Sequence, residues 1–400
     1  MKRVIMIPTY EEALAITKKN KNFFEKVEEV GGLSVSIFGH RLASYTDFYD
    51  ENDNETHALE LRGITYVRDS NGGAIDCYPA LRKFFNINQT KGSMYDDLVN
   101  VPITRVQDKL DGSLINFIYD GSIFHAKSKM TFYSEQALEA NKILARDYKL
   151  KKFLYACNDG WFGEKMFPTF ELVGPWNKIV LDYRDTKLIL LQLRREDGTL
   201  VDFSGSDWID KLFDMGIEFS KEFFRDPYHD IDFLLFKCAT LNDTEGFIVT
   251  FKNGKMVKFK TKWYFDMHKL VTEHVTSENV IIEMTLNETI DDALVQLDRE
   301  DVRRKYAEDI ATKFSNWFNT EVDRVESILE YDPDITKRKR FAQKHNGDPL
   351  FSVMMKSFND SSKVQENLKV MMLKSLRKLG SAQEFVKNIL NIQKDVDYKV

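Results

Sequence analysis

The pattern of hydrophobic and polar positions changes character along the chain. Up to about residue 265, short stretches alternate apolar and polar side chains, or stay apolar, between turn signals, which is typical of β-strands. Three of them are followed by a tight-turn dipeptide, at Asp120-Gly121, Asp197-Gly198 and Asn253-Gly254. These dipeptides favour the type I′ turns of β-hairpins. The pattern therefore predicts antiparallel sheets built from hairpins.

Apolar residues every three or four positions predict helices instead. Before residue 265 this spacing indicates only two helices, at 134–147 and 206–215. After residue 272 it dominates, over 291–318, 320–330 and 365–392, with breaks at Pro333, Gly347–Pro349 and Gly380. The expected strands are 34–39, 114–119, 122–127, 187–193, 246–251 and 255–260. We therefore expect an α+β protein with two domains, residues 1–272 and a helical domain at 273–400.

Composition narrows the class of protein. The chain has 400 residues, of which 43% are hydrophobic and 30% charged, as in an ordinary soluble globular protein. No stretch approaches the ~18 apolar residues of a membrane span, and the apolar run before Pro8 is too short for a secretory signal. The cysteines at 77, 157 and 238 lack the spacing of a disulfide framework or a zinc site. We expect a cytoplasmic protein without membrane contact.

Charge is unevenly distributed. The formal net charge is −6, but residues 337–400 hold 14 Lys and Arg against 6 Asp and Glu. A basic end on an acidic body suits a segment that binds a polyanion, although solvated helix faces have the same composition. The basic run Lys337–Arg340, with Lys344 and His345, is open to the same two interpretations and to a nuclear localisation signal. We favour an RNA-facing helix start. The acidic run at 47–55 is interpreted as a solvated loop rather than a metal site.

The segment Lys109–Ser113 directly precedes the expected strand at 114–119. A lysine beside a glycine that permits close approach of a ligand suits a covalent amine nucleophile. A lysine with an ordinary pKa of about 10.4 is mostly protonated at pH 7, so it needs a nearby like charge or burial. Lys258 and Lys260, two residues apart on an expected strand, project from one face and offer that like charge. A Lys-x-Asp-Gly motif alone is a weak signal.

Other motifs accompany this lysine in a fixed order. They are Leu61–Gly63, Arg82–Asn86, Lys127–Lys129, Ser134–Leu138, Phe170–Val173, Asn177–Val180, Glu245–Val249, Val257–Lys260 and Lys260–Tyr264. From about Ala58 to His268 the series resembles the covalent nucleotidyltransferase superfamily of ATP-dependent ligases and capping enzymes. More narrowly it resembles the RNA ligase 1 type, the phage tRNA-repair ligases. The resemblance implies an antiparallel-sheet nucleotidyltransferase (ATP-grasp-like ligase) domain followed by an all-α C-terminal domain that binds RNA and sets specificity.

The resemblance also implies a role for each matching residue. Lys109 attacks the α-phosphate of ATP, and Asp111, Glu245, Lys258 and Lys260 complete the catalytic set. The implied nucleotide-binding residues are Arg62, Lys83, Phe85, Lys109, Gly112, Lys129, Glu171, Lys258 and Lys260. Among them Arg62 and Lys83 hold the leaving end of the triphosphate, Phe85 lines the nucleotide pocket and Glu171 contacts the ribose. A divalent ion, Mg²⁺ or Mn²⁺, is needed for chemistry on a polyanion, with Glu245 and Asp291 as candidate ligands.

The function implied is ATP-dependent joining of RNA 5′-phosphate and 3′-hydroxyl ends through lysyl-AMP and adenylylated RNA. Broken tRNA is the implied substrate, and we expect a monomer in the host cytoplasm of a phage. Leu110 and Met130 depart from the family's usual acidic residue and glycine, which affects fine substrate preference. One alternative is a non-catalytic protein that binds RNA ends. The other is a DNA ligase or capping enzyme, although these usually carry an OB-fold after the lysine domain.

Overall fold

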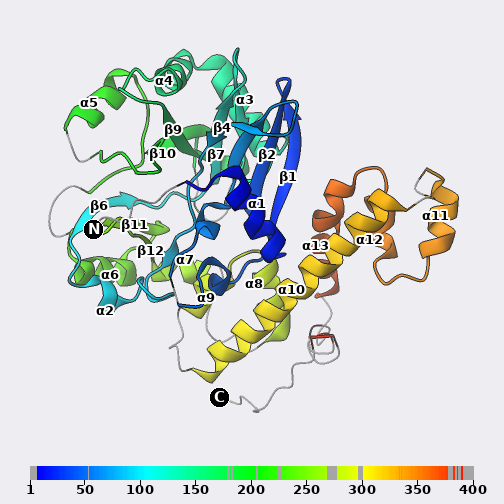
Figure 1. The fold of residues 1–400 in the computed structure, drawn as a ribbon. Coiled ribbons are helices and arrows are strands. Elements are labelled where there is room, and N and C mark those ends of the chain that lie inside the picture. The colour runs from blue at the N-terminus through cyan, green and yellow to red at the C-terminus, as the bar shows by residue number, and fades with distance from the viewer. Residues whose placement is uncertain are drawn as a thin grey trace. The chain divides into compact units, whose positions relative to one another are not determined.

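The chain divides into two compact units. The computed structural model describes residues 7–52, 54–177, 181, 183–203, 206–223, 228–267, 277–295, 301–332, 334, 336–376, 382, 385, 389 and 390. The first unit comprises Met1–His40 and Tyr45–Lys269, and the second comprises Arg41–Ser44 and Leu270–Val400. Of the motifs above, most of Asn177–Val180 lies outside the described residues. Figure 1 follows the chain from blue to red.

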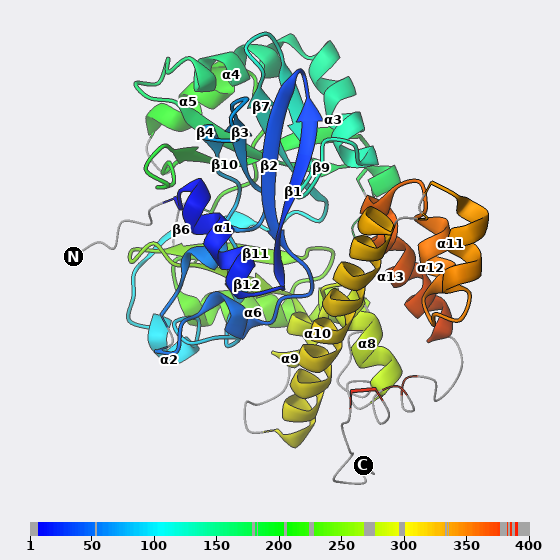
Figure 2. The ribbon, with the colours of Figure 1, turned by 45° about the vertical axis from the view of Figure 1, so that its right-hand side comes forward.

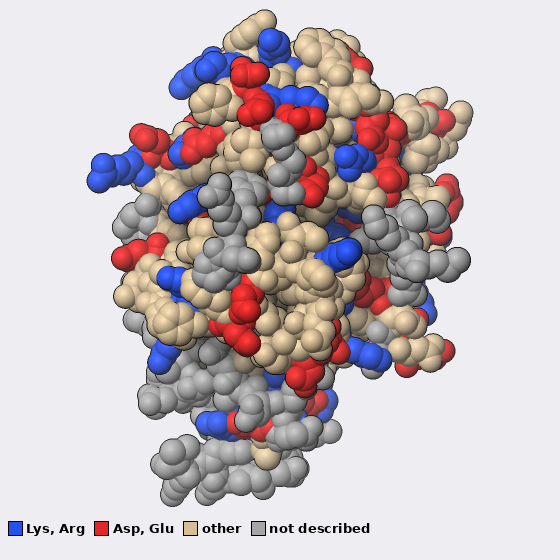
Figure 3. All heavy atoms as spheres, turned by 90° about the vertical axis from the view of Figure 1, so that its left-hand side faces the viewer, with Lys and Arg blue, Asp and Glu red and all other residues tan. Residues whose placement is uncertain are grey.

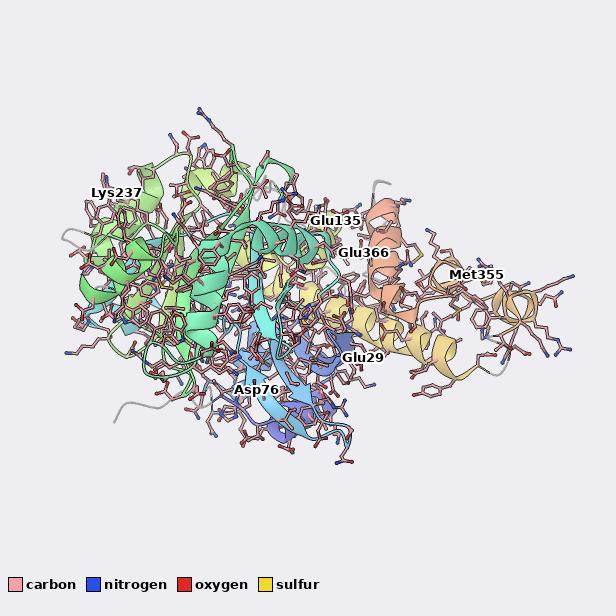
Figure 4. All side chains as sticks on the ribbon, turned by 90° about the horizontal axis from the view of Figure 1, so that it is seen from above. Glu29, Asp76, Glu135, Lys237, Met355 and Glu366 are labelled. Carbon is pink, nitrogen blue, oxygen red and sulfur yellow. The ribbon has the colours of Figure 1, made fainter. Side chains whose placement is uncertain are left out.

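The first sheet of the first unit is an antiparallel meander. Its order is β1-β2-β3-β4, with β1 (Phe23–Val30), β2 (Leu33–His40), β3 (Ile64–Arg68) and β4 (Ala74–Tyr78). The strand expected at 34–39 is β2. Glu29 on β1 and Asp76 on β4, labelled in Figure 4, mark its two edge strands. α1 (Tyr10–Lys19) begins at a capping box of Thr9 and Glu12 and contacts β1.

The second sheet is contacted by two helices of the first unit, α3 (Glu135–Arg146) and α4 (Tyr148–Asn158). Its order is β10-β9-β7-β8, all antiparallel, with β7 (Ser113–Tyr119), β8 (Phe124–Lys127), β9 (Met166–Val173) and β10 (Lys187–Arg195). The β7–β8 pair confirms the hairpin predicted at Asp120-Gly121. α3, capped by Ser134, contacts β8, and α4 contacts β9, as Figure 2 shows. Every residue of β9 is buried.

The third sheet brings together distant parts of the sequence. Its order is β5-β12-β11-β6, with β5 (Phe85–Asn86), β6 (Ile103–Asp108), β11 (Gly246–Phe251) and β12 (Met256–Lys260). The β11–β12 hairpin at Asn253-Gly254 confirms the prediction, and the short β5–β12 pair is the parallel one. α6 (Ile231–Thr240) packs Leu234 and Cys238 with Val106, Phe247 and Phe259 of this sheet.

Some local predictions needed correction. The turn at Asp197-Gly198 forms, but the chain returns through one bridge, Arg194 to Leu200, and not through a strand. α5 (Ser206–Asp214) confirms the helix predicted at 206–215. α1, α4 and α6 were not predicted. In α6 a nearly continuous apolar run resembles a buried strand, but the helix begins at the N-cap Asp230, whose side chain accepts from Phe233 N.

Shorter elements of the first unit are α2 (Tyr95–Leu98), α7 (Lys262–Met267), η1 (Tyr45–Phe48), η2 (His57–Glu60) and η3 (Pro175–Asn177).

Within its described residues, the second unit contains helices and no strand. They are α8 (Glu278–Leu286), α9 (Ile290–Leu294), α10 (Val302–Tyr331), α11 (Arg338–His345), α12 (Phe351–Lys356), η5 (Ser361–Lys363) and α13 (Val364–Ser375). α10 continues through Asn319, which lies between the stretches expected at 291–318 and 320–330, and the buried Asn319 amide donates to Arg41 O at 2.9 Å. The first of these stretches is divided, since α9 ends at Leu294 and α10 begins at Val302. Pro333, Gly380 and most of 377–392 lie outside the described residues. Among the described helices, α10 included, none has the length and apolar character of a membrane span.

Candidate active site

Lys109 is fixed at the junction of two strands. It follows β6 directly, and its backbone N donates to Gly246 O at 2.9 Å, which continues the pairing of β6 with β11. Gly246 has φ +138°, and a Cβ there would lie 1.9 Å from Phe259 O on β12. Only glycine therefore allows β11 and β12 to meet this closely beside Lys109.

Glu245 holds two lysines on one carboxylate oxygen. Its Oε1 lies 2.7 Å from Lys109 Nζ and 3.0 Å from Lys260 Nζ, and the residue is 2% exposed. Burial by itself raises the pKa of Glu245, but the two ammonium groups outweigh it and hold the pKa below the usual value. Glu245 is therefore an ionised group that joins the end of β6 to the end of β12. In place of direct like-charge contact, a carboxylate connects Lys109 with Lys260.

Lys258 and Lys260 lie on one side of β12. Phe259 between them is fully buried on the opposite side, in the core under α6. Lys258 Nζ lies 5.2 Å from the centre of the Phe84 ring, and Lys260 Nζ lies 4.9 Å from that of Tyr264. These aromatic faces help to orient the two ammonium groups, of which Lys260 is connected to Lys109 through Glu245.

Asp111 is bound to the surrounding protein. It is 2% exposed, and its carboxylate accepts from Tyr264 OH at 3.1 Å and from Leu181 N at 2.8 Å. Its backbone N donates to Tyr183 OH at 3.0 Å. These contacts fix the turn that follows Lys109. The sequence did not identify Tyr183 or Tyr264 as site residues, although Tyr264 ends a motif that was noted and could have been included on that ground.

Glu171 on β9 and Gly112, just before β7, lie close together at the second sheet. A Cβ on Gly112 would lie 2.4 Å from Leu172 O and 3.0 Å from Glu171 Cγ, so glycine is needed for this approach. Burial raises the pKa of Glu171 to about 8, Lys109 and Arg62 oppose the rise, and Glu245 and Asp111 add to it. At neutral pH Glu171 is therefore mostly protonated and can both donate and accept a hydrogen bond.

This raised pKa predicts a specific pH dependence of stability. Because the Glu171 pKa is higher in the folded chain, its contribution to stability is complete below the unfolded value near 4.5 and is lost as the pH rises to about 8. Glu171→Gln removes that loss. We expect the variant to be about 1–3 kcal/mol more stable than the wild type at pH 8.5 and similar at pH 4.5, measured by urea unfolding. If the free energy of unfolding changed equally with pH in both proteins, the raised pKa of Glu171 would be contradicted.

The residues expected at the triphosphate end lie between the first and third sheets. Arg62, after η2, donates from Nη1 to Leu81 O at 3.4 Å. Lys83 Nζ lies 5.7 Å and 5.6 Å from the ring centres of Phe48 and Phe85. Phe85 is 3% exposed and, with Lys83, lines a cavity of about 280 Å³. The structure thus brings the Lys83 cation and the Phe85 ring together.

Lys127 and Lys129 have different surroundings. Lys129 follows β8 and is partly exposed, whereas Lys127 is 1% exposed at the end of that strand. Burial lowers the pKa of Lys127 to about 7, against the effect of Glu28. Of these two lysines, only Lys129 was predicted to be a site residue.

A larger cavity, of about 740 Å³, opens beside Lys109. It is lined mainly by aromatic and apolar side chains, including Tyr183, Phe223, Tyr228 and Trp263, with Lys221 among its polar residues. This volume is in the range of small-molecule sites. On the face drawn in Figure 3, Lys and Arg side chains are interspersed with Asp and Glu.

The two metal candidates belong to different units. Glu245 lies in the first unit, and Asp291 lies in the first turn of α9 in the second. Across the part of the chain that the structure describes, no group of three or more His, Cys, Asp or Glu side chains forms a ready-made metal site. Among the described residues, neither Glu245 nor Asp291 therefore belongs to such a group.

Comparisons with known proteins agree with the motif series. A family model described as RNA ligase matches residues 60–267, more than half of the chain. The "Putative RNA ligase" of Thermovibrio ammonificans is 24% identical over 304 residues, 74% of each chain. An archaeal ATP-dependent RNA ligase structure covers 84% of this chain and 86% of its own, at 10% identity and TM-score 0.45. A structure of Naegleria gruberi RNA ligase with PPi covers 62% of this chain and 99% of its own, at 13% identity and TM-score 0.35. From the family model, the chain belongs to the RNA ligase family.

Proposed function

We propose that this protein is an ATP-dependent RNA ligase that uses Lys109 as its nucleophile and joins RNA 5′-phosphate and 3′-hydroxyl ends. The observation that carries the proposal is the shared carboxylate: Glu245 contacts both Lys109 and Lys260, beside a cavity of about 740 Å³. A buried ion pair of this kind adds little to stability but orients an amine. Membership of the RNA ligase family supplies the substrate class.

In the first step, Lys109 gives up one ammonium proton and its Nζ attacks the α-phosphorus of ATP. A P–N bond forms, the P–O bond to pyrophosphate breaks, and a second Nζ proton leaves. Glu245, 2.7 Å from Nζ, is the base in contact with that amine. Lys258 and Lys260 lie on the same side of β12, where they neutralise the charge that develops on the phosphoryl oxygens.

The remaining parts of ATP are assigned to the surrounding residues. Arg62 and Lys83 hold the β- and γ-phosphates, and Phe85 packs beneath Lys83. The mostly protonated Glu171 contacts the ribose hydroxyls, and Lys129 also binds the nucleotide. Gly112 allows the nucleotide to approach the backbone, and Asp111 keeps the Lys109 turn in place through Tyr264.

A divalent ion fits the donors that are present. Mg²⁺ needs only one or two protein carboxylates. Burial raises the pKa of Glu171, and Glu245 and Asp111 add to the rise, so a cation beside these carboxylates would be favourable. Glu245 is the ligand that we propose in the first unit, and Asp291 in the second. Bound Mg²⁺, or Mn²⁺, would neutralise charge on the phosphates and on departing pyrophosphate.

The later steps involve RNA. AMP passes from Lys109 to the RNA 5′-phosphate as a 5′-5′ pyrophosphate, and a 3′-hydroxyl then attacks that RNA phosphate, which seals the strand and releases AMP. We propose broken tRNA as the substrate and a monomer in the host cytoplasm of a phage. The net basic segment at 337–400 would contact RNA phosphates. Among the described residues of the second unit, all elements are helical, which favours this assignment over a DNA ligase or capping enzyme with an OB-fold.

A joining assay separates the proposal from its alternatives. With ATP and Mg²⁺, we expect RNA carrying a 5′-phosphate and a 3′-hydroxyl to be sealed, and a tRNA cut in one loop to be sealed faster than linear RNA of equal length. The same RNA with a 5′-hydroxyl is the matched control and should not react. Sealing with GTP in place of ATP, or RNA binding without any sealing, would favour a capping-type enzyme or a non-catalytic binder.

A further inference from the structure

Lys127 is the most fully buried cation of the second sheet, and the mechanism above does not use it. Its Nζ donates to three backbone carbonyls, those of Gly63 at 2.9 Å and of Ser128 and Lys129 at 3.1 Å. These acceptors use all three of its N–H groups. A buried ammonium held by carbonyls is more costly than a methionine of similar shape, so packing alone does not explain a lysine here.

The carbonyls that Lys127 joins belong to two loops that carry site residues. Gly63 directly follows Arg62 and precedes β3 on the first sheet, whereas Ser128 and Lys129 follow β8 on the second. The loops lie in close contact, because a Cβ on Gly63, at φ +101°, would lie 2.4 Å from Lys129 O. Lys127 therefore joins the backbone beside Arg62 to the backbone of Lys129.

The loop that carries Lys129 is also held from its other end. Glu28 on β1 accepts from Thr131 Oγ1 at 2.6 Å and from Phe132 N at 3.0 Å. Met130 packs against β2 so closely that a Cβ on Gly39 would lie 2.1 Å from its Sδ. Met130 stands where the family often has glycine, and Gly39 supplies the space that the larger side chain needs. The loop thus has one fixed position, with Lys127 as its polar anchor.

We infer that Lys127 is a positioning residue, which sets Lys129 relative to Arg62 by holding the backbone carbonyls of Gly63, Ser128 and Lys129. The inference rests on the proposed function, because Lys129 and Arg62 are assigned there to ATP. Lys127 itself has no contact with the reacting atoms in this scheme. A displacement of about 1 Å at such a residue can change a rate by two orders of magnitude.

The test replaces Lys127 with methionine, which keeps the shape and removes the ammonium. We expect the KM for ATP in lysyl-AMP formation to rise about 10- to 100-fold, with a smaller change in kcat. The unfolding temperature should stay within about 3 °C of the wild type, since the loss of three hydrogen bonds is offset by the absence of a buried charge. A variant with wild-type KM, or one unfolded at the assay temperature, would overturn the inference.

A double-mutant cycle with Lys129→Ala tests the route of the effect. If Lys127 acts through Lys129, K127M should change KM less than about threefold in the K129A background, against 10- to 100-fold alone. Equal effects in both backgrounds would show that Lys127 does not act through Lys129. Thr131→Val, which releases the Glu28 contact without touching Lys127, should raise KM in the same direction. If the wild type itself forms no lysyl-AMP, the proposed function fails, and this outcome is distinct from failure of the inference.

Discussion

Replacing Lys109 with alanine is expected to abolish the covalent reaction with ATP. Wild-type protein incubated with ATP and Mg²⁺ should gain the mass of one AMP, while Lys109→Ala should gain none, a loss of at least about 1,000-fold in rate. The physical reason is that Nζ of Lys109 is the atom that we propose bonds to phosphorus, and alanine has no amine there. Intact-protein mass spectrometry is the measurement.

Lys165 provides a matched control. Its side chain is 20% exposed, and its Nζ lies 2.7 Å from an Asp76 carboxylate oxygen. Lys109 has the same side-chain exposure and the same distance to Glu245. Lys165→Ala therefore removes a lysine of equal exposure together with its ion pair, whose acidic partner is 39% exposed against 3% for Glu245, and should leave adenylylation unchanged. An AMP adduct on Lys109→Ala, or its loss in both variants, would contradict the assignment of Lys109.

The sequence predicted the strands of the site better than the contacts between them. Periodicity and turn dipeptides were sufficient for β7, β8, β11 and β12, because a hairpin is a local structure. The pairing of β6 with β11, which places Lys109 next to Gly246, joins residues more than a hundred positions apart. No local pattern reports such a pairing. The helix α6 was missed for a related reason, since its apolar run is fixed as a helix only by packing and by the cap at Asp230.

Within the site, the sequence predicted residue types but not their electrostatic surroundings. It indicated that Lys258 and Lys260 share a face, which follows from the two-residue repeat of a strand. It did not predict that Glu245 would join Lys260 to Lys109, because that contact depends on the positive φ of Gly246 and the close approach of β12. Lys129 was preferred to Lys127 because its distance from Lys109 matches the family's pattern, and that distance does not report the burial of Lys127, which is a property of the folded chain.

Of the substitutions proposed for this protein, Arg194→Met is expected to lower the free energy of unfolding most. Arg194 and Glu60 are each 2% exposed at the side chain, and two N–H···O contacts of 2.6 Å and 2.7 Å join them. Arg194→Met leaves the Glu60 charge buried without this partner, which should lower the free energy of unfolding by about 3–5 kcal/mol in urea titrations. Lys142→Met, which breaks the exposed pair with Glu139, is the control and should change it by less than about 0.5 kcal/mol.

The double variant Glu60→Leu with Arg194→Met separates stability from function. Replacing both charges with apolar groups should recover most of the lost free energy, because a buried ion pair and a well-packed apolar pair are of similar stability. Arg194 also donates to Ala80 O at 2.8 Å, three residues before Lys83, and Glu60 lies two residues before Arg62. The pair therefore positions both residues assigned to the triphosphate. We expect the double variant to fold yet bind ATP at least about tenfold more weakly, and wild-type affinity would show that the pair serves the fold alone.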